Sequence, residues 1–135
     1  MNNEFSDLNL SLDWLEDEFA LFLILGDNSE KMDTFLKEKG YHVFKIDINN
    51  YQSEDYFRDF MDCLRENNKV SHIWVKLNIE DDKRVSVILS LLNRIRSRLE
   101  ANKKHVYIQL KASYGPKIVT YAPDLLTIRQ NIIEI

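Results

Sequence analysis

Five short runs rich in β-branched and aromatic residues alternate along the chain with longer segments of helical periodicity. The runs are Phe19–Leu25, His42–Ile48, Ser71–Leu77, His105–Leu110 and Ile132–Ile135. Strands separated by helices of this length form βαβ units, whose strands are parallel. The first run is apolar almost throughout, which indicates that helices cover both faces of the sheet. The sequence therefore predicts an α/β fold: a three-layer α/β/α sandwich around a mainly parallel five-stranded sheet with right-handed crossovers.

The segments between the runs carry signals for helix starts and ends. Asp27 followed by Glu30 forms a capping-box pattern, and Gly40 is expected to end the helix that follows. The third helix is expected to run from Asp82 to about Ala101, with its apolar stripe facing the sheet. Gly115-Pro116 is expected to open a fourth helical segment.

The 135 residues suit one domain, and we expect residues 1–135 to form a single unit. No apolar run approaches the ~18 residues that cross a bilayer, and the acidic first residues do not resemble a signal peptide. A single cysteine, Cys63, excludes an internal disulfide and a Cys-rich metal site. His42, His72 and His105 lack metal-ligand spacing and are expected at the surface or at strand edges. We expect a cytoplasmic protein that holds no metal.

Charge is distributed unevenly along the chain. The net charge is −10 up to Asn68 and +6 from Lys69 onward, which gives −4 overall. Such a split is typical of solvated helix surfaces, and it also suits two faces that bind different partners or copies of the same chain.

The turn after the first run is where many α/β proteins bind phosphate. A phosphate-binding loop has the form G-x-x-x-x-G-K-[ST], in which the lysine supplies charge and the hydroxyl holds magnesium. Counted from Gly26, the second glycine position is Lys31, the lysine position is Met32 and the hydroxyl position is Asp33. Only the first glycine of the motif is present.

Carboxylates also oppose phosphate at this turn. Asp27 and Glu30 carry the same sign of charge as a polyphosphate and repel it in a partly desolvated loop. The sequence therefore favours a structural turn. The alternative is a rearranged nucleotide site, whose candidate cofactor-binding residues are Gly26, Asp27, Asn28, Ser29 and Glu30, aided by Glu80 and Arg96.

The end of the third run also departs from a nucleotide-hydrolysing site. In a P-loop enzyme this strand end presents an aspartate to magnesium, whereas the residue here is Asn78. A neutral amide binds magnesium poorly. Asp81 or Asp82 is expected to cap the next helix.

Two motifs in the second half of the chain resemble a known family. They are "LLNRIRSRL", with Asn93, Arg94, Arg96 and Leu99, and "YAPDLLTIRQ", with Ala122, Pro123, Asp124, Leu125 and Arg129. Over Phe19 to Ile135 the chain resembles a bacterial P-loop ATPase-like domain of STAND-type and AAA-like proteins. Ser97 replaces an aspartate of the family's first motif, and Leu126 replaces a tryptophan of the second.

The resemblance implies a sheet order of 5-1-4-3-2, with the second strand at an exposed edge. It also implies that the chain keeps the scaffold of the family but does not hydrolyse ATP, because the sequence departs from the family at Lys31, Met32, Asp33 and Asn78. Relatives with eroded motifs are thought to act as inactive regulatory or adaptor modules of bacterial defence and signalling systems.

Three further residues are candidates for a structural or anion-sensing role. Arg96 lies close to the apolar stripe of its helix, where a charge needs a partner, and Asp124 is a candidate for it. Arg129 lies beside the last strand and suits a tie to a helix end.

The third helix also offers a candidate interaction surface. Val87 and Leu91 lie off its core stripe and one turn apart, where a solvated helix is usually polar, while Arg94 and Arg98 point outward. The edge strand His42–Ile48 is a second candidate, since it could add a strand from a partner.

The sequence therefore predicts a non-enzymatic interaction or regulatory module that binds a protein partner or itself. We expect no cofactor, no nucleic acid, no membrane and no nucleotide. One alternative is a nucleotide-binding protein or weak ATPase with a rearranged site. Another is a flavodoxin-like receiver or TIR-like module.

Overall fold

The computed structural model describes residues 5, 8–9, 12, 18–65, 69–128 and 130–135. The strands are β1 (Ala20–Leu25), β2 (Val43–Asp47), β3 (His72–Leu77), β4 (His105–Leu110) and β5 (Gln130–Glu134). The α-helices are α2 (Ser29–Glu38), α3 (Asp55–Cys63), α4 (Asp82–Arg94), α5 (Arg96–Glu100) and α6 (Gly115–Tyr121). The 3-10 helices are η2 (Ile48–Asn50), η3 (Ala112–Tyr114) and η4 (Pro123–Leu126).

All five strands are parallel and lie in the order β2-β3-β4-β1-β5. Read from the other edge this is 5-1-4-3-2, the order that the sequence resemblance implied. The two edge strands are β2 and β5, and β1 lies between β4 and β5. The carboxyl ends of the strands lie on one side of the sheet, where an open α/β fold binds its ligands.

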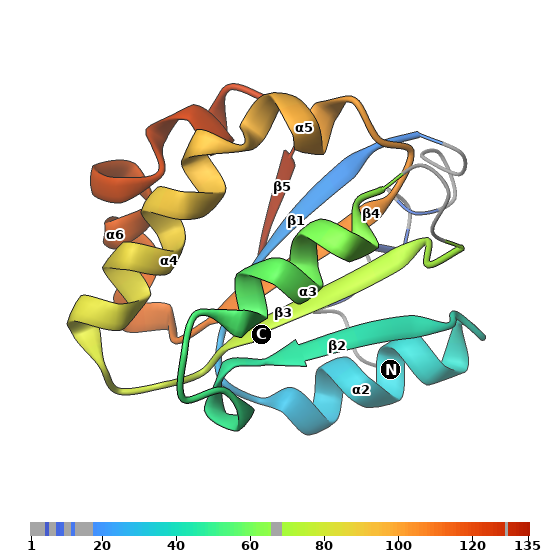
Figure 1. Ribbon diagram of the computed structural model, residues 1–135. Helices are drawn as coiled ribbons and strands as arrows, with labels where there is room; N and C mark the ends of the chain where they lie inside the picture. The colour runs from blue at the N-terminus through green and yellow to red at the C-terminus, as the bar shows by residue number, and fades with distance from the viewer. Residues whose placement is uncertain (1–4, 6–7, 10–11, 13–17, 66–68, 129) are drawn as a thin grey trace.

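Helices cover both faces of the sheet, so the predicted three-layer sandwich is confirmed (Figure 1). One face packs against the apolar sides of α3, α4, α5 and α6, with Ile88 and Leu99 among the buried contacts. The other face packs against α2 through Met32 and Leu36, and against Phe5 and Leu8. Among the described residues no helix combines the length and apolar character needed to cross a bilayer.

Helix α2 ends at Glu38, and the predicted stop residue Gly40 follows its C-cap Lys39 with a φ of +75°. The Gly40 N–H donates to the Lys37 carbonyl at 3.0 Å, and the Tyr41 N–H donates to the Leu36 carbonyl at 3.3 Å. These two bonds form a Schellman motif, which requires a left-handed residue at this position.

The expectation of one long third helix is wrong. The chain leaves the helical conformation at Ile95, with φ −102° and ψ 15°, so that α4 and α5 are separate helices. The Ile95 N–H donates to the Leu92 carbonyl at 3.2 Å, a contact that tightens the last turn of α4. Gly115 and Pro116 open α6, as expected.

Candidate functional site

The β1–α2 turn lies where the fold family of open α/β sheets binds ligands, and it consists of only three residues, 26–28. Gly26 has a φ of +143°, and a Cβ on it would lie 2.4 Å from the carbonyl oxygen of Ile135. The chain after β5 therefore packs directly against the turn. Little backbone is left to wrap a phosphate.

Two buried side chains that are hydrogen-bonded to one another support the turn. The Gln109 Nε2 donates to the Gly26 carbonyl at 2.8 Å, and the Trp74 Nε1 donates to the Gln109 Oε1 at 3.1 Å. Both side chains are buried. Because buried amides need partners, these bonds fix the turn in one conformation.

The cap of α2 differs from the prediction. Asn28, and not Asp27, is the N-cap, and its Oδ1 accepts from the Lys31 N–H at 3.1 Å. The helix starts one residue later than the Asp27–Glu30 pattern requires, because the Asp27 carbonyl accepts from the Ser29 N–H at 2.9 Å. The cap satisfies a donor that a phosphate at this helix end would need.

Asn78, at the end of β3, closes the turn from the side. Its Nδ2 donates to the Ser29 Oγ at 3.0 Å and to the Asp27 carbonyl at 3.3 Å. Its Oδ1 is buried and has no hydrogen-bond partner among the described residues. The unused group is an acceptor, which repels phosphate oxygens.

The residues at the motif's lysine and hydroxyl positions face elsewhere. Met32 is fully buried in the core between α2 and the sheet. Asp33 forms an ion pair with Lys37 at 2.9 Å along the exposed side of α2. Neither residue faces the end of β1, so a lysine at position 32 would point into the core.

Two further carboxylates at this end of the sheet, those of Asp81 and Glu80, form structural contacts. Asp81 caps α4, accepting from the Arg84 N–H at 3.0 Å, as one of the two residues predicted for this role. Glu80 lies 2.8 Å from Lys111, and this contact lowers the pKa of Glu80 and raises the pKa of Lys111. Among the described residues no three His, Cys, Asp or Glu side chains form a group that could hold a metal ion.

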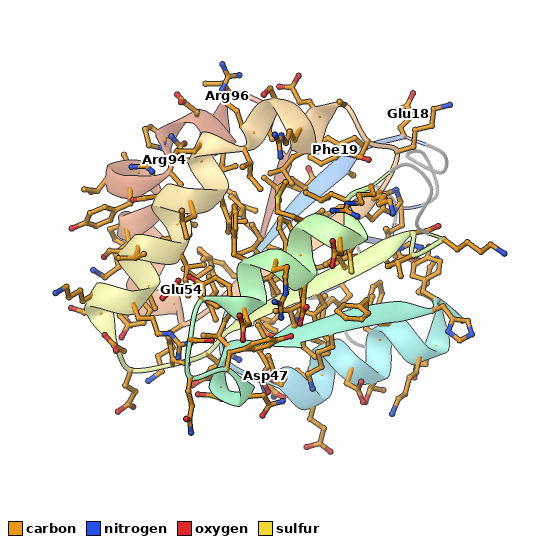
Figure 2. All side chains as sticks on the ribbon, in the orientation of Figure 1. Glu18, Phe19, Asp47, Glu54, Arg94 and Arg96 are labelled. Carbon is orange, nitrogen blue, oxygen red and sulfur yellow. The ribbon has the colours of Figure 1, made fainter. Side chains whose placement is uncertain are left out.

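Arg96 and Asp124 lie near one another, but the closer partner of Asp124 is Asn93. The Arg96 Nε is 3.9 Å from the Asp124 Oδ2, and the Arg96 Nη1 is 4.0 Å from Glu100. Asn93 forms two hydrogen bonds to Asp124, one of them to its backbone N–H at 2.7 Å. Figure 2 shows Arg94 and Arg96 on the side of the molecule away from α2. Arg129 lies outside the described residues.

The structure brings together part of the predicted interaction surface. Val87, Leu91 and Arg94 line one side of a groove of about 610 Å³ between α4 and α6, which lie next to each other in Figure 1. Val87 is 44% exposed. Arg98 is not part of it: it lines a separate hollow of about 320 Å³ near the end of α3, because the chain turns at Ile95.

Sequence reasoning missed the other side of this groove. Lys117 and Tyr121 of α6 face Val87 and Leu91 across it, and Tyr121 is 40% exposed. A signal was present, since Lys117 and Tyr121 are four residues apart and lie on one face of a helix.

The expectation that all three histidines are surface or edge residues is wrong for His105. His42 is exposed, but His105 is buried, and His72 lies on the internal strand β3. The His72 ring stacks on Tyr41 with centroids 4.0 Å apart, and its Nδ1 lies 3.0 Å from the Tyr107 hydroxyl. Burial, helped by His105, lowers the pKa of His72 to about 4.

Cys63 has a basic neighbour that its sequence surroundings do not indicate. The Lys104 Nζ donates to the Cys63 carbonyl oxygen, and both residues are buried. Burial raises the pKa of the Cys63 thiol despite the opposing effect of Lys104. A thiol with a raised pKa is a poor nucleophile.

No protein-family model matches the chain, and no curated protein matches it either. The family resemblance therefore rests on the motif residues of the sequence.

Proposed function

We propose that this chain is a non-enzymatic protein-interaction module that binds its partner in the α4–α6 groove. The observation that carries the proposal is the groove itself, where Val87 and Tyr121 remain 44% and 40% exposed between two packed helices. Large apolar side chains gathered on one face are typical of interaction surfaces.

We propose that the chain has no enzymatic activity because of the contacts made by the β1–α2 turn. Its three residues are held by Gln109 and Asn78, its cap is satisfied by Asn28, and Met32 is in the core. Each of these contacts uses a group or a space that a polyphosphate needs. The geometry supports a structural role for the turn better than a nucleotide site.

The scaffold is proposed to be that of a degenerate P-loop ATPase-like domain of the STAND and AAA-like type. The sheet order 5-1-4-3-2 and the Asn93–Asp124 contact, which joins the two motifs of the resemblance, support this proposal. On that basis the chain would act in the cytoplasm as an adaptor of a bacterial defence or signalling system.

A first experiment tests the absence of nucleotide binding. Isothermal calorimetry with ATP, ADP and GTP in the presence of Mg²⁺ is expected to give no saturable heat in the micromolar range. Saturable micromolar binding, lost when Asn28 is replaced by a residue that leaves the fold intact, would place a nucleotide at the turn and overturn the proposal.

A second experiment tests the surface. The double variant Val87→Asp/Leu91→Asp introduces two charges into the groove, and Arg98→Glu is the matched control on the neighbouring hollow. Affinity capture from the source organism, compared by quantitative mass spectrometry, is expected to show a partner that the wild type and the control retain and the double variant loses. Retention of every partner, and of the oligomeric state in light scattering, by a folded double variant contradicts the proposal.

A further inference from the structure

On the side of the groove formed by α4, charged and apolar side chains follow one another in a regular order. Lys83, Val87, Leu91 and Arg94 all line the groove and follow one another along one stripe of the helix. Two apolar residues are therefore flanked by a cation at each end. The two cations are three turns apart, about 16 Å along the helix axis.

The opposite side of the groove adds a third cation, and that cation is held in place. The Lys117 Nζ donates to the Ser86 Oγ at 3.1 Å and lies 3.9 Å from the Asp82 carboxylate. It also lies 5.3 Å from the centre of the Tyr121 ring. These contacts connect α6 to α4, so the groove exists before a partner arrives.

The charge of the groove is positive overall. Among the described residues its lining includes Lys83, Arg94 and Lys117 against a single carboxylate, Asp82. Lys83 and Arg94 are exposed. The lining therefore attracts an acidic group at either end and apolar groups between them.

We propose that the partner of this groove is an acidic amphipathic helix, with carboxylates about three turns apart on either side of an apolar stripe. The inference rests on the proposed function and specifies its partner. In such a complex the apolar side chains contact Val87, Leu91 and Tyr121, and the carboxylates pair with Lys83 and Arg94. Helices recognise grooves between helices in this manner, through anchors at i, i+3 or i+4, and i+7.

The same features disfavour the other polyanions that a basic groove could bind. Val87 and Leu91 separate the cations, so the groove offers only a few positions at which a nucleic acid backbone could pair its phosphates. The chain as a whole carries a net charge of −4, with its acidic half at −10, which repels a long polyanion or an anionic bilayer at a distance. A short helix with carboxylates in the right positions experiences mainly the local field.

The inference is tested with a display library of helical peptides of about 18 residues, built on an alanine-rich scaffold with randomised positions along one face. Selection on the wild-type chain is expected to enrich peptides with carboxylates on both sides of two or more apolar residues. Their affinity should fall about tenfold or more in Lys83→Glu/Arg94→Glu. The control Arg98→Glu should change it by less than about twofold.

A charge swap makes the test specific. Peptides whose carboxylates are replaced by lysine should bind Lys83→Glu/Arg94→Glu better than they bind the wild type. If the selected peptides lack carboxylates and fail to bind Val87→Asp, the proposal of an acidic partner is wrong, but the groove remains the interaction surface. Binders that are insensitive to Val87→Asp, or a library that yields no binder, overturn the proposed function as well. Binding of single-stranded DNA or of phosphatidylserine vesicles to the wild type, but not to Lys83→Glu/Arg94→Glu, would show that the partner is a polyanion and not a helix.

Discussion

Asn93 is bonded to Asp124 through both atoms of its side-chain amide, although 31 residues separate them. The Oδ1 accepts from the Asp124 N–H at 2.7 Å, and the Nδ2 donates to the Asp124 Oδ2 at 3.2 Å. The contact joins the last turn of α4 to the first turn of η4. It provides a partner for a backbone donor that η4 itself cannot satisfy.

Replacing Asn93 by alanine is expected to lower the free energy of unfolding by about 1–2 kcal/mol, because two hydrogen bonds are lost and a backbone donor loses its partner. Arg96→Ala is the matched control. Its contacts to Asp124 and Glu100 are at 3.9 and 4.0 Å between half-exposed side chains, and its cost is expected to stay below about 0.5 kcal/mol. Urea unfolding of both variants measures the difference. A larger loss for Arg96→Ala would show that the ion pair, and not the amide, holds η4.

The two glycines with positive φ give a prediction about the β1–α2 turn. Gly26→Ala is expected to cost roughly 2–4 kcal/mol, because its Cβ would meet the Ile135 carbonyl and its φ of +143° is strained for alanine. Gly40→Ala is the control, since a Cβ there meets nothing within 4 Å and only the φ of +75° opposes it, at about 1 kcal/mol. Thermal unfolding compares them. Equal losses would mean that the close approach of Ile135 to the turn does not constrain it.

The sequence predicted the layers and the strands because both depend on local periodicity and on the order of elements, whereas the edge position of β2 came from the family resemblance and not from periodicity. It did not predict the break at Ile95. No glycine or proline marks that position, and the contact that fixes the chain nearby, between Asn93 and Asp124, is made across 31 residues.

The site was predictable only in part for a similar reason. The missing lysine and aspartate can be read from Met32 and Asn78, but the cap at Asn28 depends on where α2 begins. The second side of the groove depends on how α6 packs on α4, which no local pattern of α4 contains. Arg94 and Arg98 look equivalent on one continuous helix and are separated once the helix ends at Arg94.

The histidine cluster predicts a dependence of stability on pH. The pKa of His72 is lowered from 6.5 to about 4 in the folded chain, so between these values the unfolded chain binds a proton that the folded chain does not. The contribution of His72 to the free energy of unfolding is therefore complete above pH 6.5 and falls as the pH drops toward 4. The slope from this group is at most ~1.4 kcal/mol per pH unit. The groups that face His72 are Tyr41, Tyr107 and His105.

The measurement is urea unfolding at several pH values for the wild type and His72→Gln. The variant is expected to be less stable at pH 7 and to lose less stability on acidification, because glutamine does not titrate. His42→Gln, at an exposed position, is the control and should retain the profile of the wild type. Identical profiles for the wild type and His72→Gln would assign the acid sensitivity to other groups.

Restoring the lysine of the phosphate-binding motif is expected to damage the fold without creating a site. Met32 is fully buried against the sheet, so Met32→Lys places an unpaired ammonium in the core and should lower stability by about 3–5 kcal/mol. Met32→Leu keeps the apolar volume and should cost less than about 1.5 kcal/mol. Chemical unfolding together with calorimetry in ATP and Mg²⁺ measures both effects. A Met32→Lys variant that is as stable as the wild type and binds ATP would require position 32 to face the end of β1, contrary to its burial among Phe22, Ile24 and Leu36.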